Sequence, residues 1–345
     1  MSNQSIKHSI EPRKRAFTVY RMILCMALLI CTGLLPPVIH GEEMNADPVP
    51  PLPLLVSARR GDTPATIARR YLNDASKGWM IGEYNGIVAL SGGQAVMVPL
   101  APFRPGGLTP DGYQTVPVLA YSDIGESPGQ KQRVSRSAFN DQMRWLKTEG
   151  FTAITPMQLI DFTQFSSQLP QRAVLITADT ESRALYDQGV PVLKELGFTA
   201  TVFVATEVVG NEGAMTWDQL RQLREAGFTI GCRGRSGRSL TRQKNGQAFE
   251  AYFKSIESEL RLAKKEIETR LGAPCPFLAY PRGSTSGLVA AMAAKLGFSA
   301  AFIRSPGDNP FFGDRFGIHR IAIDGRINPE KFGKMLTTLI TADLN

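Results

Sequence analysis

The stretch AVLITADTE, residues 173–181, decides the fold class of this chain. Its first six residues are apolar or β-branched and show no alternation with polar residues. Such a run is typical of a strand that is buried on both faces, as in a parallel sheet covered by helices. Asp179 and Glu181 follow where the strand ends. The stretch therefore predicts an α/β fold with acidic side chains at one edge of its sheet.

The same pattern is repeated on both sides of this stretch. Further short apolar runs stand at 116–121, 151–154, 200–204, 229–232, 276–280 and 300–303. Helical patterns separate them at 137–149, 186–196, 216–226, 250–271 and 288–296. Repeated strand–helix units with short buried strands predict a parallel sheet that is closed, or nearly closed, as a barrel. Active sites of such folds lie at the C-terminal ends of the strands, so candidate residues are sought there.

These strand ends carry motifs that resemble the polysaccharide deacetylase family. The matching segments, in the family's order, are VPVLAYSDI (116–124), AVLITADTE (173–181), ATVFV (200–204), MTWDQL (215–220), GFTIGCRGRSGRSL (227–240) and FLAYPRG (277–283). The resemblance covers roughly residues 116–325. It implies a distorted (β/α) barrel of about seven strands and metal-assisted removal of acetyl groups from N-acetylated sugars.

The catalytic positions that the resemblance implies depart from the family's pattern. In the family, one Asp and two His hold a metal that polarises the amide carbonyl and activates water, while a neighbouring Asp takes the proton. Here the base is present as Asp179, but Thr180 replaces the metal-binding Asp. Arg233 and Gly237 replace the two histidines, and Ser122 replaces a histidine often found in the opening strand. We therefore expect no metal and no other cofactor.

The histidine count leads to the same expectation without any alignment. The chain has three histidines, of which His8 and His40 lie in the N-terminal segment and His319 lies in the folded part. A zinc site needs about three ligands from Cys, His, Asp and Glu, and arginine has no free lone pair to offer. Asp179 with one distant histidine or cysteine does not supply such a set.

Arginine side chains surround the positions of the missing ligands. Four of them lie on two loops that are expected to approach the same strand ends: Arg233, Arg235, Arg238 and Arg282. A guanidinium group suits carboxylate, sulfate or phosphate groups. We hypothesise a pocket that accepts an acidic or substituted glycan, with Arg233 paired to Asp179 when it is empty and Tyr280 as a further substrate-binding residue. The alternative is a charged loop in solvent.

Two metal-free catalytic alternatives remain open at the same strand ends. Asp179 and Glu181 are two residues apart and could form the carboxylate pair of a glycosidase. His319, in the sequence GIHRI, could act as an acid with Asp179 as the base. Otherwise His319 is an ordinary strand residue beside Arg320. Our main interpretation is a polysaccharide-binding pseudoenzyme, and the alternative is a divergent deacetylase or hydrolase that uses Asp179.

A small separate module lies at 54–100, between the proline-rich spacer 46–53 and the Pro/Gly-rich linker 101–113. It is expected to fold as β-α-α-β, with Thr63 as the N-cap and Pro64 at the first position of its first helix. The module resembles a LysM domain through the segments RGDT (60–63), IA (67–68), YL (71–72), NG (85–86), GQ (93–94) and PL (99–100).

The LysM resemblance implies binding to glycans that contain N-acetylglucosamine, such as peptidoglycan. The residues that it places in the binding groove are Gly61, Asp62, Thr63, Asn85, Gly86 and Ile87. The alternative is a structural spacer, in which Asp62 only caps a helix.

The N-terminal segment, 1–45, is expected to direct export. Basic residues up to Arg21 are followed by the apolar run 22–35, MILCMALLICTGLL, and by Pro36-Pro37. This run spans about 21 Å as a helix, less than the roughly 30 Å of a bilayer core, which is typical of a secretory signal. If it is not cleaved it is a membrane anchor, and no other membrane contact is expected. The mature chain is then expected in the periplasm, in the cell envelope or outside the cell.

The net charge of +8 overstates how basic the exported chain is, because residues 1–41 carry half of it. The remaining surplus fits an acidic surface or glycan and is too weak to predict nucleic acid binding. Cys232 and Cys275 are expected to be free and buried, with a single disulfide as the alternative. The expected partner is polysaccharide or peptidoglycan. The expected organisation is a signal or anchor at 1–45, a glycan-binding module at 54–100, a linker at 101–113 and a deacetylase-like domain at 114–345.

Overall fold

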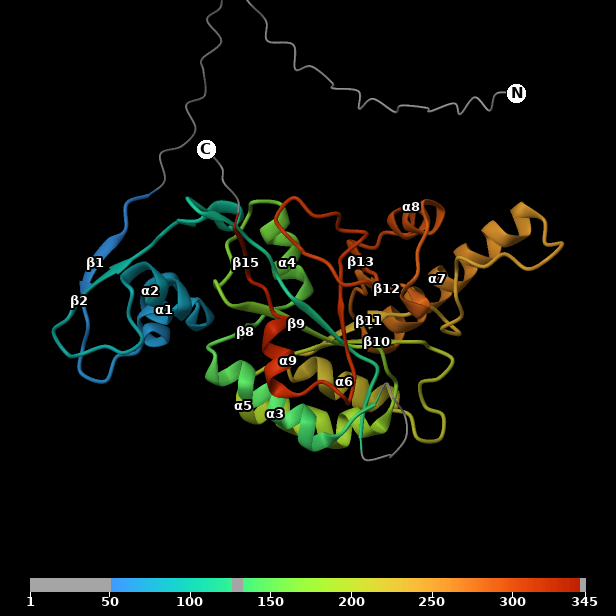
Figure 1. The fold of residues 1–345 in the computed structure, drawn as a ribbon, viewed down its shortest axis with the longest axis horizontal. Coiled ribbons are helices and arrows are strands. Elements are labelled where there is room, and N and C mark those ends of the chain that lie inside the picture. The colour runs from blue at the N-terminus through green and yellow to red at the C-terminus, as the bar shows by residue number, and fades with distance from the viewer. Residues whose placement is uncertain (1–50, 126–132, 342–345) are drawn as a thin grey trace, which may run out of the picture. The chain divides into compact units, whose positions relative to one another are not determined.

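Seven parallel strands form the central sheet of the large domain (Figure 1). The computed structural model describes residues 51–125 and 133–341. In spatial order the strands are β13 (Ala300–Phe302), β12 (Phe277–Ala279), β11 (Thr229–Cys232), β10 (Thr201–Val204), β9 (Ala173–Ala178), β5 (Val118–Tyr121) and β14 (Ile321–Ile323). All pairs along this path are parallel, and β8 (Thr152–Ala153) pairs with β9 beside it. The predicted α/β class with a barrel-like sheet of seven strands is confirmed.

Helices connect the strands and cover the sheet. They are α3 (Arg136–Thr148), α4 (Pro156–Thr163), α5 (Val190–Leu196), α6 (Trp217–Glu225), α7 (Phe249–Leu271), α8 (Gly287–Lys295) and α9 (Pro329–Lys334). Thr216 and Gln219 form a capping box at the start of α6, as their spacing predicts. Helices α4 and α9 were not expected, although Thr155 and Asn328 cap them and a proline follows each cap.

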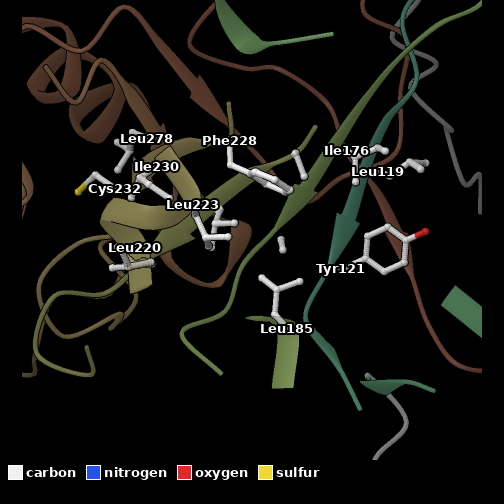
Figure 2. Packing of buried hydrophobic residues seen from close by; sticks show 14 of the residues in the cluster. Leu119, Tyr121, Ile176, Leu185, Leu220, Leu223, Phe228, Ile230, Cys232 and Leu278 are labelled. Carbon is white, nitrogen blue, oxygen red and sulfur yellow. The ribbon is translucent and has the colours of Figure 1, made fainter. Parts of the chain in front are cut away.

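The sheet is buried on both faces. Alternate residues of each strand point in opposite directions, and the residues of both sets lie in buried clusters. On β9, Ile176 belongs to the outer core cluster, whereas Leu175 belongs to the inner cluster on the concave face. Figure 2 shows part of the outer cluster, in which strand residues such as Ile176 and helix residues such as Leu223 are buried together. In the inner cluster the rings of Phe203 and Phe302 lie 5.2 Å apart between centroids. This two-sided burial explains the continuous apolar runs in the sequence.

The segment 318–323, which ends in β14 (Ile321–Ile323), contacts both β13 and β5. Ile318 forms a parallel bridge with Phe302 of β13, and three residues later β14 pairs with β5. Ile318 belongs to the inner cluster, so Arg320, two residues further on, faces the same way. The side chain of Arg320 is completely buried. The closing segment therefore brings a cation into the middle of the half-barrel.

The N-terminal module is the predicted βααβ unit. Its elements are β1 (Leu54–Ser57), α1 (Pro64–Leu72), α2 (Gly78–Asn85) and β2 (Ala95–Val98). The two strands pair antiparallel, and Thr63 caps α1 with Pro64 at its first position, as expected. The module has its own small core, in which Ile67 and Ile81 of the helices pack with Val96 of β2.

The stretch expected to be a linker contains ordered structure. In it, β3 (Leu108–Thr109) pairs with β4 (Gly112–Gln114), and β4 pairs with the C-terminal β15 (Leu339–Thr341). A further short pair joins β6 (Asp123–Ile124) to β7 (Arg133–Val134). Glu83 of the module forms an ion pair with Arg104 and accepts a hydrogen bond of 2.8 Å from the backbone nitrogen of Gln171. The module and the large domain belong to one compact unit, Pro50–Asn345.

The two cysteines of the folded part are free and buried, which confirms the expectation for them. Burial raises the pKa of Cys232 to about 12. Within residues 51–125 and 133–341, no helix combines the length and the apolar character that crossing a bilayer requires. The expected export segment, 1–45, lies outside the described residues.

Candidate functional site

Polar side chains from five segments meet on the concave face of the half-barrel. Ser122, Asp179, Arg233 and Arg304 follow β5, β9, β11 and β13 by one or two residues and continue the inward-facing rows of these strands. Arg320 joins them from the closing segment. The carboxyl ends of parallel strands lie at one edge of a sheet, which is why residues so distant in sequence come together here.

Arg320 holds Asp179 through a two-point ion pair. Its Nη1 lies 2.6 Å from Oδ1, and its Nη2 lies 2.8 Å from Oδ2. Arg320 also donates to the carbonyl oxygen of Ile303 at 3.1 Å and to the hydroxyl of Thr177 at 3.2 Å. The Asp179 side chain is only 8% exposed. The expected pairing of Asp179 with Arg233 is therefore wrong, because Arg320 occupies both oxygens of this carboxylate.

Arg233 pairs with Glu181 instead. Its Nη2 lies 2.7 and 2.8 Å from the two carboxylate oxygens, and the backbone nitrogen of Ala205 donates to Oε1 as well. The Glu181 side chain is 8% exposed and that of Arg233 is 21% exposed. A glycosidase needs one carboxyl group as an acid and another as a nucleophile or base. Because each carboxylate here is engaged by its own arginine, Asp179 and Glu181 do not form such a pair.

The positions that the resemblance assigns to metal ligands do not fit a metal ion. A side chain at Gly237 would begin 3.8 Å from Nη1 of Arg233, so the two positions that the resemblance assigns to histidines are neighbours in space. Gly237 has a φ of +69°, which favours glycine. The hydroxyl of Thr180 accepts a hydrogen bond from the Ser182 backbone nitrogen. In the described part of the chain, no group of three His, Cys, Asp or Glu residues could hold an ion.

Arg304 is the third guanidinium group of the site, and the sequence analysis missed it. Its Nη2 donates to the hydroxyl of Ser122, and its backbone nitrogen donates to the carbonyl oxygen of Gly283 at 3.0 Å. Burial lowers the pKa of Arg304, and the other two site arginines lower it further, whereas the charge of Asp179 opposes them. The residue directly follows an apolar run at 300–303. The strand-end rule applied to that run would have found it.

The other predicted arginines lie outside this cluster. Arg235 pairs with Glu207 at 3.1 Å, and both side chains are about half exposed. Arg238 lies 3.4 Å from Glu259. Arg282 is exposed and has a φ of +62°, which residues other than glycine rarely adopt. Of the four arginines predicted for the pocket, Arg233 alone continues an inward-facing row.

Tyr280 and His319 make no hydrogen bond to Asp179. The ring of Tyr280 belongs to the outer core cluster, and its hydroxyl donates to the carbonyl oxygen of Phe316 at 3.0 Å. Burial raises the pKa of Tyr280 to about 12. His319 precedes the inward-facing Arg320 and so faces the opposite way, with its Nδ1 3.2 Å from the carbonyl oxygen of Ser305. This arrangement favours the interpretation of His319 as an ordinary strand residue.

In the module, two of the six predicted groove residues hold the fold together. Asp62 accepts hydrogen bonds from both terminal nitrogens of Arg70, at 2.6 and 3.0 Å, and these bonds hold the pKa of Asp62 well below its usual range. The Asn85 side chain donates to the carbonyl oxygen of Met97 at 2.7 Å and accepts from its backbone nitrogen at 2.8 Å. Asn85 thereby ties α2 to β2, so both side chains have structural roles.

The remaining predicted groove residues lie at turns or beside a cavity. Gly61 and Gly86 have φ values of +84° and +63°, a conformation that disfavours other residues. Thr63 and Ile87 line a cavity of about 560 Å³, together with Val88. Residues of the large domain complete the lining of this cavity: Gly150, Thr152, Pro170, Gln171 and Arg172.

Comparison with known proteins gives one family match and several relatives. Residues 166–301 match the family model for polysaccharide deacetylases, a match that does not reach the module. YxkH of Bacillus subtilis, named as a polysaccharide deacetylase, is 24% identical over 224 residues, which are 65% of this chain and 77% of YxkH. A poly-beta-1,6-N-acetyl-D-glucosamine N-deacetylase of Staphylococcus aureus is 24% identical over 156 residues, 44% of this chain. The alignment spans about half, 53%, of that relative's length.

Solved structures share the fold of the large domain. The Streptococcus pyogenes deacetylase PplD in complex with acetate superposes with a TM-score of 0.59 at 19% identity, covering 65% of this chain and 98% of that one. A polysaccharide deacetylase from Bacillus cereus superposes with a TM-score of 0.57 at 22% identity, covering 71% and 74% of the two chains. At these identities the likeness establishes the architecture alone.

Proposed function

We propose that this chain, whose residues 166–301 match the family model for polysaccharide deacetylases, binds a cell-envelope polysaccharide at a site that does not perform metal-dependent deacetylation. The observation that carries the proposal is the ion pair between Glu181 and Arg233. It engages Arg233, which stands where the resemblance places a metal-binding histidine, at a site where a Lewis acid would polarise the amide carbonyl, a contribution of several kcal/mol. A carboxylate and a guanidinium that bond to each other supply no such polarisation.

The proposed ligand class comes from the relatives. The family is named for polysaccharide, and the S. aureus relative is named for a polymer of N-acetylglucosamine. We therefore infer that the large domain binds a polysaccharide with N-acetylated sugars. The ion pairs favour binding over turnover, because each carboxylate of the site is engaged by an arginine and is not free to accept a proton.

Acetate release and polysaccharide binding, measured on the same preparation, test the proposal. With zinc added, we expect retention on immobilised poly-N-acetylglucosamine but no acetate release above that of Asp179→Asn. A zinc-dependent deacetylase run in parallel shows that the substrate is competent. Acetate release that depends on Asp179 would refute the loss of catalysis, and absence of retention would refute polysaccharide binding.

A divergent deacetylase or hydrolase is the second candidate. The observation that favours it is the presence of Asp179 at the position of the family's base, at the end of β9. Its weakness is that Arg320 bonds to both oxygens of Asp179, so a substrate or water would have to displace a buried ion pair before the carboxylate could accept a proton. The acetate assay decides between the two candidates.

We propose that the module is a second glycan-binding element, of the LysM type. Its βααβ order and the cavity beside Thr63 and Ile87 support this. Val88 lines the cavity and is 98% exposed, so its side chain can contact a ligand without supporting the fold.

A charged residue at position 88 tests the module. We expect Val88→Asp to lower retention on peptidoglycan about five-fold, because an apolar contact with the sugar rings is replaced by a solvated charge. Leu52→Asp is the control, since Leu52 is 82% exposed and does not line the cavity. Equal retention of both variants and the unmodified chain would show that the module is only a spacer.

The proposed location is the cell envelope or the outside of the cell, from the N-terminal segment alone. Its basic residues and short apolar run are those of a secretory signal. Fractionation of cells that produce the chain checks this, and finding it only in the cytosol would contradict export.

A further inference from the structure

We propose that Arg304, together with the hydroxyl of Ser122, binds a carboxylate group of the polysaccharide, so that the domain selects an acidic glycan such as one that contains uronic acid. This inference rests on the proposed function, because it specifies the ligand class of the same site. It replaces the sequence-based expectation of an anion pocket built from Arg233, Arg235, Arg238 and Arg282.

The charges at the strand ends do not balance. Asp179 and Glu181 are the two carboxylates, and each is engaged by its own arginine. Arg304 adds a third guanidinium group that faces the same concave side. Within residues 51–125 and 133–341, no carboxylate forms a salt bridge with Arg304. The described groups of the site therefore carry an excess of one positive charge, located on Arg304.

The surroundings of Arg304 favour the arrival of an anion. The guanidinium is partly buried, which lowers its pKa; the charge of Asp179 opposes this effect, and the two other positive groups lower the pKa further. A charged group that has lost water and gained like-charged neighbours is stabilised by an opposite charge at close range. A ligand carboxylate would provide that charge without displacing either existing ion pair.

The hydrogen-bond geometry around Arg304 suits a planar carboxylate. Ser122 accepts a hydrogen bond from Nη2 of Arg304, which leaves the hydroxyl hydrogen of Ser122 free to donate to a ligand. A guanidinium can also give a carboxylate two parallel N–H bonds. Arg304 and Ser122 can thus offer three donors to one anion, whereas a neutral acetamido group would leave the charge of Arg304 unbalanced.

The backbone around Arg304 is fixed by its neighbour on the loop after β12. The Arg304 nitrogen donates to the carbonyl oxygen of Gly283 at 3.0 Å, and a Cβ built on Gly283 would lie only 2.1 Å from the Cβ of Arg304. Such close contact requires a glycine and holds the base of the arginine side chain in place. Arg304 is therefore positioned in advance of any ligand, which lowers the entropy cost of binding.

Calorimetric titration of the full chain with matched oligosaccharides tests the proposal. The probes are hexagalacturonate, its carboxyl-reduced neutral form and a neutral N-acetylglucosamine hexamer. We expect the acidic hexamer to bind about ten-fold more tightly than its reduced form. Equal affinity for these two would overturn the inference. Retention on neutral poly-N-acetylglucosamine would then still support polysaccharide binding, the proposed function. Failure to bind any glycan would refute both polysaccharide binding and the selection of an acidic glycan.

Substitutions test whether Arg304 and Ser122 cause the preference for the acidic hexamer. Arg304→Met should remove the preference for the acidic hexamer, Arg304→Lys should keep part of it, and Ser122→Ala should weaken it. Arg235→Met is the matched control, because Arg235 is half exposed and paired with Glu207, and it should leave the preference unchanged. Arg304→Met should melt at the same temperature as the unmodified chain or higher, since it relieves repulsion between like charges. A lower melting temperature, or an unchanged preference, would contradict a ligand-binding role.

Competition distinguishes the planar anion from tetrahedral ones. Glucuronate should displace the acidic hexamer at lower concentration than inorganic phosphate or sulfate does. Stronger displacement by phosphate or sulfate would overturn the assignment to a carboxylate.

Discussion

Replacing Arg320 by methionine is expected to lower the free energy of unfolding by about 3–5 kcal/mol. The substitution leaves Asp179 buried at 8% exposure without the two guanidinium bonds that balance its charge. It also removes a donor to the carbonyl oxygen of Ile303, inside the barrel. Urea denaturation followed by circular dichroism measures the change through its midpoint and slope.

Two controls separate the loss of the partner from other effects. Arg144→Met removes an arginine from an exposed ion pair with Glu195, and it should cost less than about 1 kcal/mol. The double variant Arg320→Met with Asp179→Leu removes both charges and should recover much of the lost stability, because no uncompensated charge remains. A loss below about 1 kcal/mol for Arg320→Met alone would show that Asp179 finds another partner or water.

Gly283→Ala is expected to lower the free energy of unfolding by about 3 kcal/mol and to remove the preference for acidic glycans. Gly283 has a φ of +75°, which costs about 1–2 kcal/mol for an alanine. The new methyl group would also lie 2.1 Å from the Cβ of Arg304, and such overpacking typically costs about 1–3 kcal/mol. Either the loop or Arg304 must move, so binding and stability should fall together.

Gly297→Ala is the matched control for this prediction. Gly297 has a nearly equal φ of +78° but meets no heavy atom within 4 Å of its added Cβ. It should therefore lose only the conformational contribution, about 1–2 kcal/mol, and retain glycan binding. Equal losses in the two variants, measured by urea denaturation, would show that contact with Arg304 is not what requires a glycine at 283.

The fold of the large domain was predictable because its physical causes act locally in the sequence. Strands buried on both faces leave apolar runs such as 173–178, and the helix starts carry their own caps. The missed helix α4 shows the same rule: Thr155 and Gln158 form a capping box like that of α6. The capping signal for α4 is present in the sequence. The helix was missed because it has only eight residues and lies close to the short strand β8.

The partners within the site could not be predicted in the same way. Asp179 was correctly placed at a strand end, but Arg320 lies 141 residues away in sequence. Their pairing depends on the closing segment 318–323, which contacts both β13 and β5. Strand order and closure are global properties that a local pattern does not contain. Arg233 was chosen as the partner because its loop was expected to approach the same strand ends; it does reach them, but it pairs with Glu181.

In the module, the sequence predicted the fold but not the roles of individual side chains. Its βααβ order was readable from the caps and the turn glycines, yet the roles of Asp62 and Asn85 were not. Both residue types suit sugar binding, and both are used here in hydrogen bonds within the module. Sequence identifies which chemistry a side chain can perform, whereas the structure shows which of its hydrogen bonds are already taken.

Gly237 and the Glu181–Arg233 ion pair together make histidine substitutions at positions 233 and 237 costly in stability. A histidine at 237 would have to adopt a φ near +69°, at a cost of about 1–2 kcal/mol. A histidine at 233 would first strip Glu181 of its guanidinium partner and leave a buried charge uncompensated. Each single substitution toward an Asp-His-His centre is therefore expected to give a less stable protein. Engineering a metal site into this domain would need compensating changes at Glu181 and in the loop at 237, made together with the histidines.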